Sequence, residues 1–157
     1  GGIFNWGDMS LFNVTIAGNT ATSGGGANLY NSSGTIKVSN SIIAYPIGPY
    51  LTENCLNSGN LINLGINIYS DSSCGTGENI LSNTDPRLTP LAMLSGATMT
   101  RGLLEGSPAH DAVAGFCSDY RGYTLTIDQR GANRDSLCDL GAFEGVAYSV
   151  YLPVLHR

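Results

Sequence analysis

The charged residues that could support chemistry are concentrated in the last third of the chain. They are Asp111, Asp119, Asp128, Arg130, Arg134, Asp135, Asp139 and Glu144. A pair of carboxylates chosen from this set could serve as acid and base in glycoside hydrolysis. The Asp-Gln-Arg-Gly run at 128–131 is instead typical of a turn closed by a charge-assisted hydrogen bond. We therefore expect these charges to be structural, and we expect no catalytic residue and no enzymatic activity.

Four of these side chains are expected to fasten irregular loops: Asp128, Arg130, Asp139 and Glu144. Arg130 should form a salt bridge with Asp139 or Glu144. The candidate metal ligands are sparse, because His110 and His156 lie far apart and no segment matches the DxDxDG calcium loop. We expect no metal site and no cofactor. Calcium held by carboxylates of this segment is the one alternative left open.

The overall charge argues against nucleic acid as a partner. The net charge is −5 and Lys and Arg are not clustered, whereas binding to a phosphate backbone relies on clustered cations. In the first half, Asp8, Lys37 and Glu53 do not recur at a common spacing, which argues against a polysaccharide lyase. No apolar run approaches the ~18–20 residues needed to span a bilayer, so we expect no transmembrane segment.

The elements that carry these residues are short and interrupted by turns. Only 12% of the residues are charged, against about 25% in an average domain, while the chain contains 21 glycines. Because 42% of the residues are hydrophobic, disorder of the whole chain is a poor explanation. The composition predicts an all-β protein with many tight turns.

An internal repeat indicates how the strands stack. The segments 2–5 and 11–17 recur as 28–31 and 38–44, at offsets of 26 and 27 residues, and a weaker echo runs through 60–62 and 65–69. Short strands at such a period are typical of a solenoid. We expect Ile16 to lie over Ile43, Leu11 over Val38, and Asn13 and Asn40 to form an amide ladder at a bend. A β-sandwich is the competing fold.

Four cysteines, Cys55, Cys74, Cys117 and Cys138, lack the CxxC spacing of a zinc site. An even number at long spacings indicates two disulfides and an oxidising compartment. Three pairings are open. Cys55–Cys74 with Cys117–Cys138 is favoured, because each closes a loop of roughly 20 residues, worth ~3 kcal/mol in the chain-entropy model.

The repeats resemble those of secreted bacterial right-handed parallel β-helix proteins. The residues that carry the likeness are Gly-Gly-Ile-Phe-Asn at 1–5, the segment 12–21, and Asn-Ser-Ile-Ile-Ala at 40–44. Downstream, the segments 63–68, 85–91, 106–112, 128–131 and 138–144 are similar to the choice-of-anchor Q domain, found at the C-terminal end of large surface proteins. The resemblance implies an extracellular or cell-surface location. It also implies that His110, which stands where the family has isoleucine, is a half-buried packing residue.

This resemblance divides the chain into three parts. Residues 1–80 would form β-helix coils, residues 81–145 a disulfide-stapled cap on the last coil, and residues 146–157 a β-prone tail. The chain opens within a repeat and without a leader sequence, so we expect a processed product or a fragment.

The two ends suggest a function. An uncovered coil edge at the start and a spare strand at the end would allow copies to join head to tail. The residues expected to mediate this contact are Ile3, Phe4, Tyr148, Val150 and Leu152. The leading hypothesis is an extracellular structural protein, either a filament subunit or a surface-anchored adhesin. The alternative is a β-helix that binds or cleaves glycans through Tyr45, Tyr50, Tyr120 and Tyr123.

Overall fold

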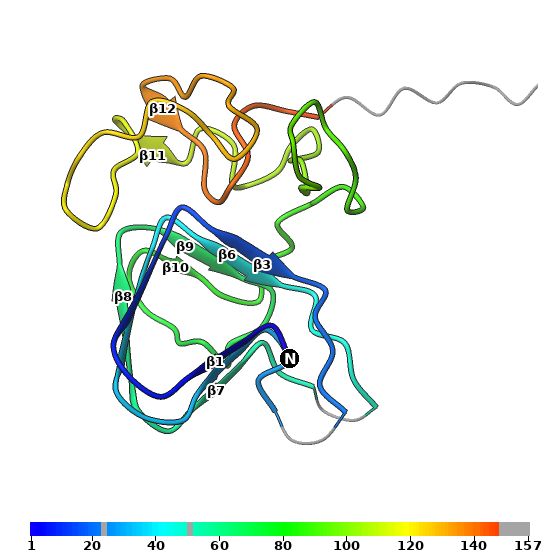
Figure 1. The fold of residues 1–157 in the computed structure, drawn as a ribbon, viewed down its shortest axis with the longest axis vertical. Coiled ribbons are helices and arrows are strands. Elements are labelled where there is room, and N and C mark those ends of the chain that lie inside the picture. Colours follow the sequence, from blue (N-terminus) through cyan, green and yellow to red (C-terminus); the bar gives the residue numbers. More distant parts are fainter. Residues whose placement is uncertain (23–24, 50–51, 148–157) are drawn as a thin grey trace, which may run out of the picture.

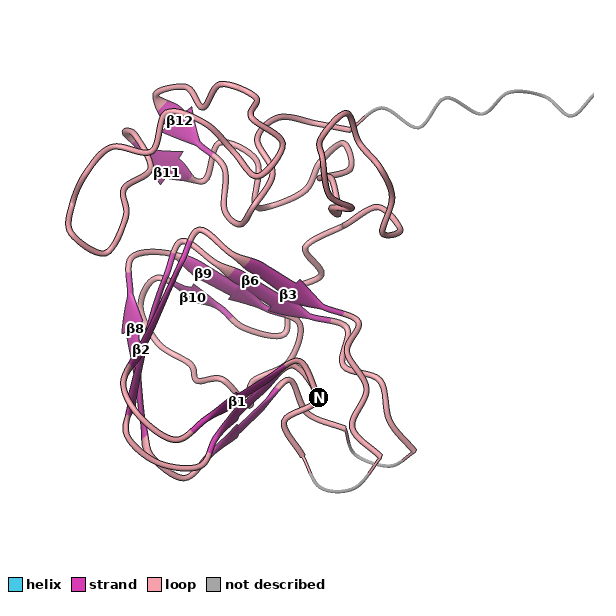
Figure 2. Ribbon diagram, viewed as in Figure 1, coloured by secondary structure: helices cyan, strands magenta, loops and turns pink. Residues whose placement is uncertain are grey.

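The computed structural model describes residues 1–22, 25–49 and 52–147. Within these ranges the protein is all-β, with strands and turns and no helix (Figure 2), which confirms the predicted class. Three short parallel sheets occupy the first half. The first contains β1 (Ile3–Asn5), β4 (Leu29–Asn31) and β7 (Cys55–Asn57), and the second β2 (Met9–Phe12), β5 (Thr35–Ser39) and β8 (Asn60–Leu64). The third contains β3 (Thr15–Ala17), β6 (Ile42–Ala44), β9 (Asn67–Tyr69) and β10 (Ile80–Leu81).

The strand register follows the sequence repeat. Leu11 pairs with Val38 and Ile16 with Ile43, as the 27-residue offset predicts. Ile3 pairs with Leu29 at the 26-residue offset. The weaker third echo also pairs, since β5 lies beside β8 and β6 beside β9. The chain therefore visits the three sheets in the same order in successive repeats, and Figure 1 shows the sheets around a common interior.

That interior is a hydrophobic core to which every sheet contributes. Leu29 of the first sheet, Val38 of the second and Ile43 of the third belong to one buried cluster, and each is at most 1% exposed. A three-residue strand cannot bury its inward side chains by itself. The repeats therefore stabilise one another by removing apolar surface from water at roughly 25 cal/mol per Å².

Asparagines form a ladder along the first sheet, with Asn5 and Asn31 buried and Asn57 exposed, and not where the sequence predicts one. Asn5 Nδ2 donates to Asn31 Oδ1 at 2.8 Å, and Asn31 Nδ2 donates to Asn57 Oδ1 at 2.8 Å. The prediction of a ladder between Asn13 and Asn40 is wrong. Both have positive φ, 53° and 49°, and the amide of Asn13 donates to the Ser118 carbonyl at 2.7 Å. Asparagine tolerates this left-handed conformation, so these two residues turn the chain instead of bonding to each other.

Glycine is required at one turn between the first and second sheets. Gly34 has φ +78°, and a Cβ at this position would overlap the carbonyl of Gly7 in the preceding repeat. The turn therefore brings two successive repeats into backbone contact that no side chain permits.

We expect Gly34→Ala to lower the free energy of unfolding by about 2 kcal/mol or more, because left-handed strain of about 1–2 kcal/mol adds to this overlap. Denaturant unfolding measures the loss. Gly131→Ala is the matched control, since Gly131 has φ +85° but nothing within 4 Å of its Cβ position. Equal losses in the two variants would mean that the repeats do not approach closely at Gly34.

Residues 70–79 contact β7 and β8, each the last strand in its sheet. Ser73 Oγ accepts from the Cys55 amide at 2.9 Å, and Asp71 Oδ2 accepts from the Asn54 amide at 2.9 Å. Cys55 is bonded to Cys74, and Cys117 to Cys138, which is the pairing that short loops favour. The first disulfide therefore fastens the segment that covers this end of the repeats.

The C-terminal segment covers more than the last repeat, on which it was predicted to pack. It lies along the outer face of the third sheet (Figure 1) and not only on the last repeat. The amide of Ala142 donates to Thr15 Oγ1 in β3, and the amide of Gly141 donates to the Asn40 carbonyl beside β6. Ile42 and Ile68 form a second buried cluster with residues of this segment: Leu88, Leu103, Ala109, Leu140 and Phe143. The two central strands of the third sheet, β6 and β9, are therefore buried on both faces.

Within this segment, regular structure is limited to one short antiparallel pair, β11 (Val113–Ala114) and β12 (Leu137–Cys138). Among the described residues, no helix is long and apolar enough to cross a membrane.

Candidate functional site

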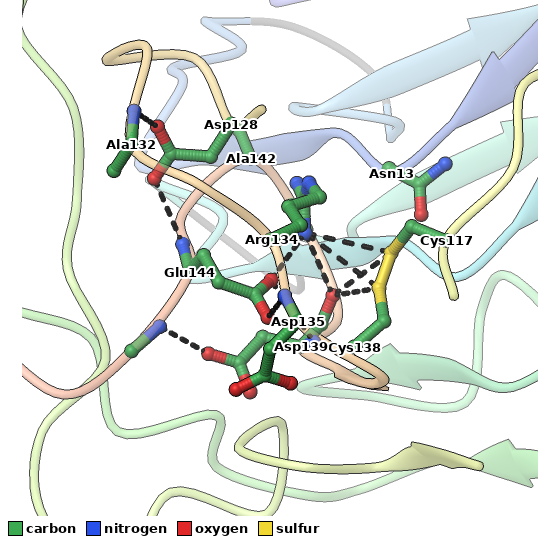
Figure 3. A network of polar contacts seen from close by, with 12 residues as sticks. Asn13, Cys117, Asp128, Ala132, Arg134, Asp135, Cys138, Asp139, Ala142 and Glu144 are labelled. Carbon is green, nitrogen blue, oxygen red and sulfur yellow. Dashed lines mark hydrogen bonds and ion pairs between the residues drawn. A yellow bond between two sulfur atoms is a disulfide. The ribbon is translucent and has the colours of Figure 1, made fainter. Parts of the chain in front are cut away.

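The densest polar cluster lies beneath the second disulfide and is centred on Arg134 (Figure 3). Its guanidinium group bonds Glu144 Oε2 at 2.7 Å, the Gly141 carbonyl at 2.7 Å and the Asp139 carbonyl at 3.3 Å. The side chains of Arg134 and Glu144 are only 2% and 8% exposed. A planar guanidinium group suits this arrangement because it donates to several acceptors at fixed angles. The ion pair joins the turn after β12 to the loop before it.

A second pair lies beside it, and its partner differs from the prediction. Arg130 pairs with Asp128 at 2.7 Å, and neither Asp139 nor Glu144 supplies the carboxylate. The reason is local, since Asp128 Oδ1 accepts the amides of Arg130 and Ala132 and so folds the turn back over itself. From that position Arg130 contacts Glu144 through the backbone carbonyl and not through the carboxylate. Its guanidinium group also stacks on Phe143, 3.5 Å from the ring centre.

The turn also determines the acidity of Asp128. Burial opposes ionisation of this carboxyl group, but hydrogen bonds from the Glu144 amide, the Arg130 side chain and the Arg130 and Ala132 amides outweigh it and hold its pKa below the usual value. Because the folded state binds this proton less readily than the unfolded state, the ionised carboxylate stabilises the fold above the unfolded pKa of about 4. That contribution is lost as the pH falls through the lower, folded pKa.

We therefore expect the stability difference between the wild type and Asp128→Asn to be large near neutral pH and to shrink as the pH falls below about 4. Denaturant unfolding at a series of pH values measures it. Gln129→Ala, an uncharged change in the same turn, serves as the control and should give a difference that does not vary with pH. A constant difference for Asp128→Asn would contradict the lowered pKa.

Asp139 is held differently from the other buried carboxylates. It is 1% exposed, and its oxygens accept the amides of Asp111 at 2.6 Å and Gly145 at 2.5 Å. In the described part of the chain, no Arg or Lys forms an ion pair with it. Burial, the largest influence, raises its pKa.

His110 and Asp111 lie next to Asp139 on the outside of the turn. Both are exposed, which corrects the expectation that His110 is a half-buried packing residue. His110 Nδ1 is 3.4 Å from Asp111 Oδ2. One potential ligand atom from each of His110, Asp111 and Asp139 lies within 4.8 Å of the other two. This proximity was not visible in the sequence, because Asp139 is 28 positions away from Asp111.

The residues expected at the self-association surface are only partly described. Phe4 is 59% exposed, its ring meets that of Tyr30 edge-on at 5.2 Å, and Ile3 beside it is half-buried. A hollow of about 370 Å³ adjoins them. Tyr148, Val150 and Leu152 lie outside the described residues.

The four tyrosines named as glycan-binding candidates do not form one site. Tyr120 and Tyr123 are exposed on the loop closed by the second disulfide. Tyr45 is half-buried and donates to Asp85, and Tyr50 lies outside the described residues. Of the charges in the first half, Asp8 and Lys37 line a hollow of about 400 Å³ on the second sheet, and Glu53 is exposed.

Comparison with known proteins adds no relative. No protein-family description matches the chain, and neither a curated protein nor a solved structure matches it. The candidate functions therefore rest on the residues and contacts of this chain.

Proposed function

We propose that residues 1–80 form the coils of a right-handed parallel β-helix and that the chain is an extracellular structural module of the choice-of-anchor Q type. The observation that carries this proposal is the strand register. Between successive repeats, the strands of each of the three sheets pair in parallel at offsets of 25 to 27 residues, and the sheets share one core. Such quasi-one-dimensional stacking is how solenoid proteins build rigid, extended bodies.

Two disulfides support an extracellular location, since such bonds persist mainly in oxidising compartments. The buried charges support a structural role over an enzymatic one. Arg134 and Glu144 satisfy each other, and Arg130 satisfies Asp128, inside the fold. These groups hold loops of their own chain together.

The module would join copies through the edge formed by β1, β2 and β3. Each of these strands is the last in its sheet, with a partner on one side only among the described residues. Residues 70–79 cover the opposite end, so a coil of one copy cannot stack there on a coil of the next. The strand offered to the free edge is therefore the alternating apolar tail of a second copy, by β-augmentation. Contacts of this kind between unlike surfaces produce filaments when they do not close.

Light scattering across a range of concentrations, followed by electron microscopy, tests this association. Val146 and Ala147 belong to the folded part because they pair with Leu103, so the truncated chain should end at Ala147. The full chain should associate with increasing concentration, and the truncated chain should remain monomeric. A control chain with Tyr148, Val150 and Leu152 replaced by serine keeps the length and should also remain monomeric. A full chain that stays monomeric throughout would overturn the proposal.

Glycan binding is the second candidate, favoured by the aromatic surface on the first sheet. Phe4 and Tyr30 are register partners, and Trp6 is 76% exposed nearby in sequence. Exposed aromatic rings beside a polar hollow provide stacking faces and hydrogen-bonding groups for a sugar. A glycan array that includes acidic polysaccharides separates this function from self-association, and binding that Tyr30→Ala abolishes would favour it.

A further inference from the structure

Three side chains with metal-binding atoms meet on the outer side of the C-terminal segment. His110 and Asp111 follow the buried Ala109, and Asp139 follows β12. One potential ligand atom from each lies within 4.8 Å of the other two, and His110 Nδ1 is 3.4 Å from Asp111 Oδ2.

The chain itself holds this arrangement in place. The amide of Asp111 donates to Asp139 Oδ1 at 2.6 Å, so the two segments are joined at the cluster. The adjacent β11 and β12 pair, and the Cys117–Cys138 disulfide joins β12 to the loop after β11. Asp111 has φ +53°, a conformation that is uncommon for residues other than glycine. The backbone therefore places the three residues near one another before any ion binds.

Asp139 supplies an independent reason to expect a cation. It is 1% exposed, and it forms no ion pair with Arg or Lys in the described ranges, whereas Asp128 and Glu144 each have an arginine. Buried charges in proteins are normally paired with an opposite charge or coordinate a metal. The amides of Asp111 and Gly145 occupy one direction at each oxygen, and a carboxylate oxygen has further lone pairs to offer.

We propose that His110, Asp111 and Asp139 bind a divalent transition-metal ion, with zinc as the best match. Zinc binds imidazole nitrogen and carboxylate oxygen, and this set provides one of the former and two of the latter. Calcium fits less well because it takes six to eight oxygen ligands. Three protein ligands leave a fourth position open, and the exposed sides of His110 and Asp111 allow water to occupy it.

The exposed residues must draw together for binding. Zinc holds nitrogen and oxygen at about 2.0–2.2 Å, which places ligand atoms roughly 3.3–3.6 Å apart in a tetrahedron. The His110–Asp111 separation already matches this spacing. Asp139 is fixed by its backbone bonds, so His110 and Asp111 are the side chains that rotate inward.

The test is zinc titration of the full, disulfide-bonded chain by calorimetry, with thermal unfolding as the second readout. We expect saturable binding of one ion. Zinc at about one hundred times its dissociation constant should raise the unfolding temperature by about 5–10 °C, and EDTA should reverse this shift. Cobalt(II) in place of zinc should give the intense visible absorption of a tetrahedral site.

His110→Ala is the decisive variant because its exposed side chain can be removed without disturbing the core. It should weaken zinc binding at least tenfold and keep the metal-free unfolding temperature. His156→Ala, which removes the other histidine, is the matched control and should bind zinc as the wild type does. Unchanged affinity in His110→Ala, or an absence of saturable binding in the wild type, would overturn the proposal.

Discussion

Replacing Arg134 with methionine is expected to lower the free energy of unfolding by about 3–5 kcal/mol, the loss typical of a buried ion pair broken on one side. Methionine preserves much of the volume but removes every donor. Glu144, with a side chain only 8% exposed, then keeps a charge without its cation, and the Gly141 carbonyl loses a bond of 2.7 Å. Burial is the main reason that the pKa of Glu144 is already raised, so the unpaired carboxylate would be neutralised by a proton at a cost in stability.

Denaturant unfolding of Arg134→Met, beside two other variants, identifies the cause of the loss. Arg121→Met removes an exposed arginine that stacks on Tyr120 and should change stability by no more than about 0.5 kcal/mol. The double variant Arg134→Met with Glu144→Leu should recover part of the loss, because it removes the uncompensated charge as well. A loss below about 1 kcal/mol in Arg134→Met would contradict the burial of this pair.

Asn28→Ala is expected to cost about 3 kcal/mol, since it leaves several buried polar groups without partners at about 1–3 kcal/mol for each fully buried group. The Asn28 side chain is fully buried and donates to the Ala44 carbonyl at 2.8 Å and to Asn54 Oδ1 at 2.7 Å. It also accepts from Asn19 at 2.9 Å. This one amide therefore connects the entry to β4 with the end of β6 and with the next repeat.

The matched control is Asn60→Ala, which removes an asparagine side chain that is exposed on β8. It should change stability by no more than about 0.5 kcal/mol. Asn28→Ala should also increase hydrogen exchange at the Asn28 and Leu29 amides, which bond to the Asn54 carbonyl. Equal losses of stability in Asn28→Ala and Asn60→Ala would contradict the stacking of repeats at this corner.

The sequence predicts the strand register well, and the reason is physical. Leu11 and Val38, or Ile16 and Ile43, are apolar residues of similar size at equivalent positions, and stacking the repeats buries them in one shared core. Local glycines and asparagines in turns also predict an all-β chain. These features can be predicted because each depends on residues within one or two neighbouring repeats.

Features that depend on distant segments could not be predicted in the same way. Asn13 and Asn40 look like a ladder because they repeat, but both residues turn the backbone, and the bonded ladder is Asn5, Asn31 and Asn57. The sequence does not distinguish an asparagine whose side chain bonds the next repeat from one whose backbone forms a turn. Only the positions of the carbonyls around each amide distinguish them.

The C-terminal segment shows the same limit. Its few strands give no periodicity from which to place it, and the contact between Ala142 and Thr15 spans 127 positions. Arg130 was expected to pair with Asp139 or Glu144. It pairs with Asp128 instead, because the turn at Asp128 brings these two side chains together. The cluster of His110 with Asp139 likewise follows from the pairing of β11 with β12. Each of these strands has only two residues, which is too short to give a recognisable pattern in the sequence.

Successive repeats stack in parallel at the offsets that recur in the sequence, and a pair of introduced cysteines can verify this stacking. Ser10 and Lys37 are register partners on β2 and β5, and neighbouring strands lie about 4.7–4.9 Å apart, within disulfide range. In the variant Ser10→Cys with Lys37→Cys, the two introduced thiols should oxidise to a disulfide that peptide mapping detects, with both native disulfides retained. Ser10→Cys with Thr35→Cys, two residues out of register and beyond about 7 Å, should remain as free thiols. A link that forms in the second variant and not in the first would contradict the stacked register and the account built on it.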